Sequence, residues 1–169
     1  GLAKPIKGFK IGVPKEFMGE GLNSEINSLV QKAISELESL GAHIDEINLP
    51  MTDYALAAYY IIVPAEISAN LARYDGIKYG LSVQEGKNLL DVYLKSRAEG
   101  LGDEVKRRIM LGTYTLSAGY YDAYYLRAQK VRALIKRDFE KIFEKYDAVV
   151  GPTMSSIAPK IGEFSNPLS

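Results

Sequence analysis

The stretches Phe9-Lys10-Ile11-Gly12-Val13-Pro14 and Ala42-His43-Ile44-Asp45-Glu46-Ile47-Asn48-Leu49 decide the fold of the first part of the chain. Both alternate apolar and polar residues, and each ends at a proline (Pro14 or Pro50), a pattern typical of short β-strands. Between them, apolar residues recur every three or four positions from residue 22 to residue 40. This spacing predicts an amphipathic helix that buries one face.

Local signals mark both ends of this helix. Asn23 or Ser24 can cap its first turn, because a short side-chain oxygen accepts a hydrogen bond from an otherwise unpaired backbone N–H. Gly41 supplies the left-handed residue that commonly ends a helix. A strand, a helix and a second strand with short connections form a βαβ unit, so we expect two parallel strands joined right-handedly.

Most of the remaining chain has helical periodicity. We expect helices at 52–63, 64–73, 82–98, 103–117 and 120–145, and a third strand at 147–150. Pro64 either breaks the first of these helices or begins the second, since proline has no backbone N–H. The apolar spacing of the longest helix predicts a buried face made of Tyr121, Tyr124, Tyr125, Ala128, Val131, Leu134, Ile135, Phe139, Ile142 and Phe143.

The fold class expected is α/β: a βαβ unit, several helices and a third strand on an incomplete sheet. Length predicts one domain over residues 1–169, with a loop-like tail at 154–169. Three parallel strands leave unpaired edges that a native protein normally covers. Together with the start at Gly1, this suggests a piece of a longer protein that supplies more strands.

Composition excludes several kinds of site. The 169 residues contain no cysteine and one histidine, His43, so disulfides, thiolate nucleophiles and multi-histidine zinc sites are ruled out. Lysines and arginines number 21, as do the acidic residues, and zero net charge argues against general nucleic-acid binding. The longest apolar stretch, 55–65, is too short to span a bilayer, so no membrane association is expected.

No self-contained catalytic motif is present, and the residues that could carry chemistry have simpler interpretations. His43 is expected to be a half-exposed strand residue on the same side as Asp45. Ser155 and Ser156 have no glycine frame, lysine or histidine near them in sequence, so they are expected to be solvated loop residues. The tyrosine pairs at 59–60, 120–121 and 124–125 are expected at the edge of the core, with buried rings and partnered hydroxyls.

The densest positive cluster is Lys106-Arg107-Arg108. On a helix, Arg107 and Arg108 point about 100° apart, so at most one shares a face with the neighbouring apolar residues. An arginine held there needs an anionic partner. That partner is either a carboxylate of the protein, in a structural salt bridge, or the carboxylate of a substrate gripped by the guanidinium fork.

Several longer segments, taken together, resemble one family. They are Tyr59-Tyr60-Ile61-Ile62 and residues 64–66, 70–76, 96–100, 104–113, 117–125, 129–132 and 147–153. In this order they resemble the bacterial glutamyl-tRNA(Gln) amidotransferase A subunits, which are amidase-signature proteins. The resemblance covers nearly the whole chain from Gly8 to about Thr153, and it implies a helix-rich part of the amidase-signature fold.

The resemblance implies a glutaminase. In the family, a serine nucleophile, a second serine in a cis peptide and a lysine act on the side-chain amide of glutamine, and all three lie upstream of the region matched here. This chain is therefore expected to hold no catalytic residue and to be inactive alone. Arg108 matches the arginine that binds the glutamine α-carboxylate, and Tyr59 matches a tyrosine lining the same pocket.

The resemblance also implies the surroundings of the protein. The partners expected are the other amidotransferase subunits and, through the complex, tRNA, in the cytoplasm. No cofactor or metal is expected in this chain, since ATP and Mg²⁺ are used elsewhere in the complex. Two alternatives stay open: a non-catalytic helical interaction domain that docks subunits or tRNA through Arg73, Lys78, Arg97 and Arg132, and part of a stand-alone amidase of the same family.

Overall fold

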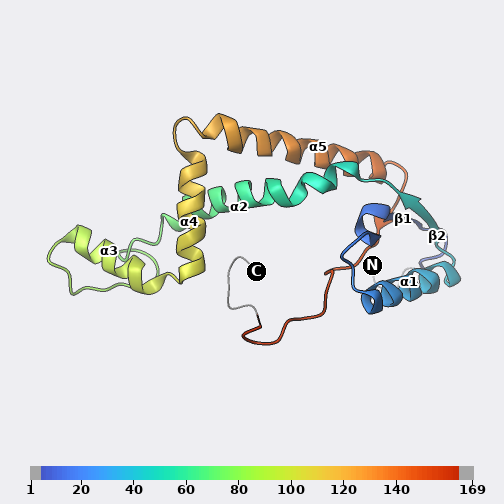
Figure 1. Cartoon of the computed structure of the whole chain (residues 1–169), viewed down its shortest axis with the longest axis horizontal. Coiled ribbons are helices and arrows are strands. Elements are labelled where there is room, and N and C mark those ends of the chain that lie inside the picture. The colour runs from blue at the N-terminus through green and yellow to red at the C-terminus, as the bar shows by residue number, and fades with distance from the viewer. Residues whose placement is uncertain (1–4, 164–169) are drawn as a thin grey trace. The chain divides into compact units, whose positions relative to one another are not determined.

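The computed structural model describes residues 5–163 (Figure 1). The chain divides into two compact units, and each is described by itself. One unit, called here the sheet unit, runs to Asp53 and resumes at Lys136; the other, the helical unit, is Tyr54–Ile135. A single domain over residues 1–169 stays a prediction. Residues 154–163 of the expected tail contain neither helix nor strand, and 164–169 lie outside the described residues.

The sheet unit contains the βαβ motif that the sequence predicts. Its elements are β1 (Lys10–Pro14), the 3₁₀ turn η1 (Lys15–Met18), α1 (Ser24–Ser39), β2 (His43–Ile47) and β3 (Ala148–Val149). The strand order is β2-β1-β3, and both pairings are parallel, with Ile11 opposite Ile44 on one side and Ala148 on the other. The predicted parallel arrangement and the third strand are confirmed.

The predicted ends of α1 are also confirmed. The Asn23 side chain accepts hydrogen bonds from the backbone N–H groups of Glu25 at 2.9 Å and Ile26 at 3.3 Å. Gly41 has a φ of 93°, a left-handed conformation that costs a glycine little because it has no Cβ. Asn23, and not Ser24, is therefore the cap.

The core of the sheet unit forms around the central strand. Four of the five β1 residues are buried, as expected for a parallel strand covered on both faces. The buried hydrophobic residues of this unit are Ile11, Val13, Ile34, Ala42, Ile47 and Leu49. The short 3₁₀ segment η2 (Pro50–Tyr54) then leads out of the sheet unit.

The helical unit differs from the sequence expectation in three respects. Its elements are α2 (Ala55–Leu71), α3 (Leu89–Gly100), α4 (Asp103–Leu116), the π-helical segment η3 (Tyr121–Tyr125) and α5 (Leu126–Phe143), which continues into the sheet unit. Pro64 lies inside one continuous α2, so the prediction of two helices was wrong. The helix expected from Ser82 begins only at Leu89, where the Asn88 side chain accepts a hydrogen bond from Asp91 N at 2.9 Å.

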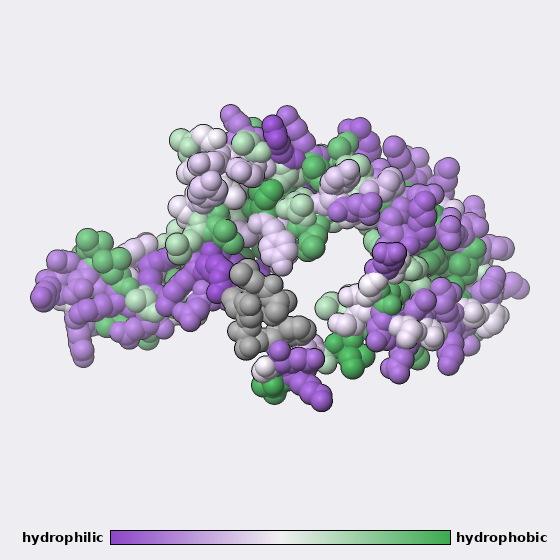
Figure 2. Space-filling model, viewed as in Figure 1, coloured by the Kyte–Doolittle hydropathy of each residue, from purple (hydrophilic) through white to green (hydrophobic). Residues whose placement is uncertain are grey.

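The third difference is the apolar face of the last long helix. The sequence predicts one helix over 120–145 with ten buried residues, but a π-helical turn precedes α5 and only Ala128 of the ten is buried. The Tyr121 side chain is 40% exposed and that of Phe143 53%. Figure 2 shows hydrophobic side chains among hydrophilic ones on the visible surface. Periodicity identifies an apolar face but supplies no partner for it, and among residues 5–163 four of these ten side chains are exposed and five half-buried.

Helices α2 and α4 pack closely at one point, where α4 crosses α2 (Figure 1). Pro64 of α2 is fully buried there, and a Cβ atom added to Gly112 of α4 would overlap the Pro64 carbonyl oxygen. The same added atom would lie 2.8 Å from the Cβ of Ser68. Only glycine lets the two backbones approach this closely.

We expect Gly112→Ala to lower the free energy of unfolding by about 1–3 kcal/mol, the usual cost of overfilling a tight contact. The sign is informative because alanine is the better helix former by about 1 kcal/mol, which alone would raise stability. Thermal unfolding measures the change. Gly19→Ala is the control, since its added Cβ would lie no closer than 3.7 Å to another residue; an equally stable Gly112→Ala would contradict the close crossing.

Candidate functional site

The structure brings together the two site residues that the sequence singles out. Tyr59 lies on α2 and Arg108 on α4, and the Arg108 Nη1 group donates a hydrogen bond of 3.2 Å to the Tyr59 hydroxyl oxygen. The two residues are 49 positions apart in sequence, so only the crossing of the two helices makes the contact. The Tyr59 ring also packs edge-on against that of Tyr60, with 5.3 Å between centroids.

A third residue, Glu104, belongs to the same cluster. It lies one helical turn before Arg108, and its Oε1 accepts a hydrogen bond of 2.8 Å from Arg108 Nε. The other oxygen of Glu104 pairs with Arg107. Glu104 was not among the site residues predicted from the sequence, although an acidic residue four positions before an arginine is a recognised helical pair.

The cluster holds Arg108 as a permanent cation. Its hydrogen bonds to Glu104 and then to Tyr59 raise the pKa of the guanidinium above its usual range. In return, the hydrogen bond from Arg108 holds the pKa of the Glu104 carboxyl below its ordinary value of 4.5. An arginine guanidinium is always charged in a protein, so Arg108 can serve as a carboxylate-binding group.

The predicted difference between the two arginines also has a structural counterpart. The Arg108 side chain is 31% exposed and contacts α2, whereas the Arg107 side chain is 43% exposed and its described polar contact is with Glu104. Among the described residues, therefore, only Arg108 of the two reaches Tyr59. The sequence left two possible partners for this arginine, a carboxylate of the protein or the carboxylate of a substrate. The structure shows the first of them, Glu104.

The other tyrosines correct the sequence interpretation. Large parts of the rings at 59, 60, 120, 121 and 124 are exposed, so the expectation of buried rings was wrong. Partners were expected for the hydroxyls, and the Tyr125 hydroxyl donates to Glu66 Oε1 at 3.2 Å. A hydrogen bond with Tyr120 raises the pKa of Tyr114 to about 12.

Of the remaining residues considered from sequence, His43 lines an open pocket with Lys10, Asp45 and Tyr146, and Ser155 lines another with Glu16 and Thr153. His43 is exposed on β2, as expected of a strand residue, and Ser155 and Ser156 lie exposed in a loop. Across residues 5–163, no group of three acidic, histidine or cysteine side chains is placed to hold a metal ion. None of the helices in that range has both the length and the hydrophobicity needed to cross a bilayer.

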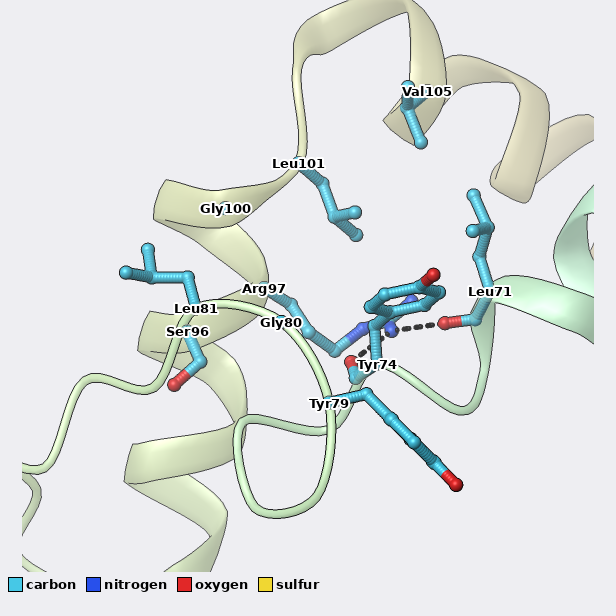
Figure 3. A pocket seen from close by; sticks show the side chains of 10 residues that line it. All are labelled: Leu71, Tyr74, Tyr79, Gly80, Leu81, Ser96, Arg97, Gly100, Leu101 and Val105. Atoms are coloured by element: carbon cyan, nitrogen blue, oxygen red, sulfur yellow. Dashed lines mark hydrogen bonds between the residues drawn. The ribbon is translucent and has the colours of Figure 1, made fainter.

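A separate cavity of about 310 Å³ lies between α3, the start of α4 and the segment after α2 (Figure 3). Arg97 reaches into it, and its Nη1 group donates to the carbonyl oxygens of Leu71 at 2.9 Å and Tyr74 at 2.8 Å. A cation at these carbonyls neutralises the negative end of the α2 dipole. Arg97 therefore secures the end of α2, and the docking alternative that names it stays a prediction.

Comparison with known proteins identifies the class. The family model described as Amidase matches residues 1–169. The chain belongs to the amidase family.

Proteins with similar sequences indicate a particular kind of amidase. The glutamyl-tRNA(Gln) amidotransferase A subunit of Desulforamulus reducens is 58% identical over 165 residues, covering 98% of this chain and 34% of that protein. The protein of the same name from Thermodesulfovibrio yellowstonii is 62% identical over 162 residues, covering 96% and 33%. The chain thus spans about a third of the length of the curated relatives it matches, and its similarity to the amidotransferase A subunits is confirmed.

Solved structures support the same fold. The glutamyl-tRNA(Gln) amidotransferase A subunit from Thermotoga maritima matches with a TM-score of 0.66 and 35% identity, over 97% of this chain and 31% of that one. A bacterial aryl acylamidase of the amidase-signature family matches with a TM-score of 0.65 and 20% identity, over 92% and 29%, and shows the fold alone. The α/β fold of the amidase-signature type is therefore confirmed.

The ion pair predicts a measurable titration. Because the pKa of Glu104 is lowered in the folded state, its pairing stabilises the fold fully above about pH 4.5, and this contribution is lost as the pH falls through the lowered pKa. An NMR titration of the Glu104 carboxyl should give a lower pKa in the wild type than in Arg108→Ala. Equal values in both proteins would contradict the contact.

Proposed function

We propose that this chain is part of the glutaminase subunit of a tRNA-dependent amidotransferase. That subunit hydrolyses glutamine, and the ammonia released converts Glu-tRNA(Gln) to Gln-tRNA(Gln) elsewhere in the complex, with ATP and Mg²⁺ used there. The observation that carries the proposal is the contact between Arg108 and Tyr59. The names of the relatives, which are glutamyl-tRNA(Gln) amidotransferase A subunits, support the transfer of an amide group to Glu-tRNA(Gln).

Arg108 and Tyr59 form part of the glutamine pocket in this proposal. A guanidinium group binds a carboxylate through two parallel N–H donors, so it fixes both the position and the orientation of an amino acid. Of the five N–H donors of arginine, Glu104 and Tyr59 each use one among the described contacts. The other donors face no described acceptor and are available to the α-carboxylate of glutamine.

The chemical step is assigned to residues outside this chain. The nucleophilic serine, the second serine and the lysine of the family belong to a segment that precedes the matched region. The role of this chain is to hold the far end of glutamine, which places the side-chain amide near the nucleophile and lowers the entropy cost of the attack. The 169 residues alone should give only background glutaminase activity, and turnover that survives repurification would contradict this assignment.

We expect Arg108→Ala in the full-length protein, assembled with its partner subunits, to lower kcat/KM for glutamine about 100-fold, the size expected when charged hydrogen bonds to a substrate are lost. Tyr59→Phe should cost less, about fivefold, because it removes one neutral hydroxyl. Steady-state kinetics with glutamine give both values. Amidation supplied with ammonium salt instead of glutamine should stay at the wild-type rate, because it bypasses the pocket.

A glutamine analogue with its α-carboxylate converted to an amide isolates the contact. The wild type should discriminate strongly against it, whereas Arg108→Ala should use glutamine and the analogue about equally poorly. Unchanged glutamine kinetics in Arg108→Ala would overturn the site. If that variant keeps its glutaminase activity but fails to assemble with the partner subunits, the chain is instead a docking domain, the main alternative drawn from the sequence.

A further inference from the structure

Glu104 occupies a position from which it can control how Arg108 meets a substrate. It stands in the first turn of α4, contacts Arg108 Nε from within the same helix, and has a side chain 54% exposed. We propose that Glu104 is a positioning residue that orients the Arg108 fork toward the α-carboxylate of glutamine. The inference rests on the proposed function of Arg108 and extends it to a residue outside the substrate contacts.

The geometry of the three residues supports this role. The guanidinium group is planar, and it is held at two different nitrogen atoms, Nε by Glu104 on α4 and Nη1 by Tyr59 on α2. Two contacts at separate atoms of a rigid plane prevent it from turning about its long axis. The plane is therefore set before substrate arrives.

Arg107 fixes the carboxylate itself. It pairs with the second oxygen of Glu104, while Arg108 takes the first. A carboxylate held on both oxygens does not rotate freely, so the hydrogen bond to Nε keeps one direction. The order of contacts runs from Arg107 through Glu104 to Arg108.

The energetics point to orientation more than to stability. Ion pairs this exposed contribute little to folding, because water and salt screen them. An arginine side chain, however, loses much rotamer freedom when it is immobilised. If Glu104 immobilises Arg108 in the free protein, glutamine binding does not bear that cost again.

The chain supplies a matched comparison for Glu104. Asp103 is also acidic and also stands in the first turn of α4, where negative charge favours the helix N-terminus. Its carboxylate is 97% exposed, and its ion-pair partner is Lys106 at 3.8 Å. Asp103 thus shares the helix position and the charge of Glu104 without a described contact to Arg108.

Two substitutions at Glu104 separate the effect of side-chain length from the effect of charge. Glu104→Asp keeps the charge but shortens the side chain by one methylene, so it should lose the contact with Nε. Glu104→Gln keeps the length and an oxygen that accepts from Nε but has no charge. The measurements are KM and kcat for glutamine, and the ammonium-supported rate, in the full-length protein assembled with its partner subunits; Asp103→Asn is the control.

A positioning role predicts that Glu104→Asp raises KM about tenfold, as for loss of one hydrogen bond to a charged group. Its kcat should stay within about twofold of wild type, because binding is affected and the chemical groups are not. Glu104→Gln should rescue KM to within about threefold, since the retained bond is neutral and therefore weaker. Asp103→Asn and all ammonium-supported rates should match the wild type.

The opposite pattern, with Glu104→Gln impaired and Glu104→Asp normal, would show that charge alone matters and would overturn the proposal. Normal kinetics in both variants would overturn it as well. Loss of the ammonium-supported rate in Glu104→Asp would assign Glu104 a structural role instead. If Arg108→Ala itself leaves glutamine kinetics unchanged, the proposed function fails; if Arg108→Ala is impaired and Glu104→Asp is not, only the role of Glu104 fails.

Discussion

The close approach of α2 and α4 at Pro64 and Gly112 is the constraint on which the candidate site depends. No side chain separates the two backbones at this point, because glycine has none and the proline carbonyl faces it directly. Arg108 lies four residues before Gly112, so both are on the same side of α4, one turn apart. The crossing that brings Gly112 against α2 therefore also brings Arg108 to Tyr59.

From the sequence, a salt bridge of Arg108 to the protein and its binding of a substrate carboxylate were alternatives. In the structure the two interactions are compatible. Glu104 uses the Nε edge of Arg108, and Tyr59 uses one terminal nitrogen. An arginine has enough donors to keep both contacts and still meet a carboxylate. A lysine would not serve in the same way, because its single ammonium group has no planar fork to orient.

The sequence predicted most accurately where structure is local. The α1 cap at Asn23 and the left-handed Gly41 depend on neighbouring backbone groups, and both were found as expected. Predictions failed where distant groups decide the outcome. Helical periodicity placed a helix at 82–88, yet the backbone there is not helical, and Ser96, from α3, accepts a hydrogen bond from Val83 N at 2.9 Å. The apolar residues of α5 were predicted to be buried, and most of them are not.

The sequence by itself determined the parallel βαβ unit, the amidase-signature likeness and the choice of Arg108 and Tyr59. The βαβ unit follows from the spacing of apolar and polar residues, whereas the choice of Arg108 and Tyr59 follows only from the resemblance of the surrounding segments to the amidotransferase A subunits. Only the tertiary structure decided that Arg108 meets Tyr59, so that the Glu104–Arg108 pair within α4 becomes part of one cluster. This outcome depends on how α4 meets α2, and Pro64 is buried at the same crossing. Contacts between residues far apart in sequence arise from packing, and periodicity does not encode them.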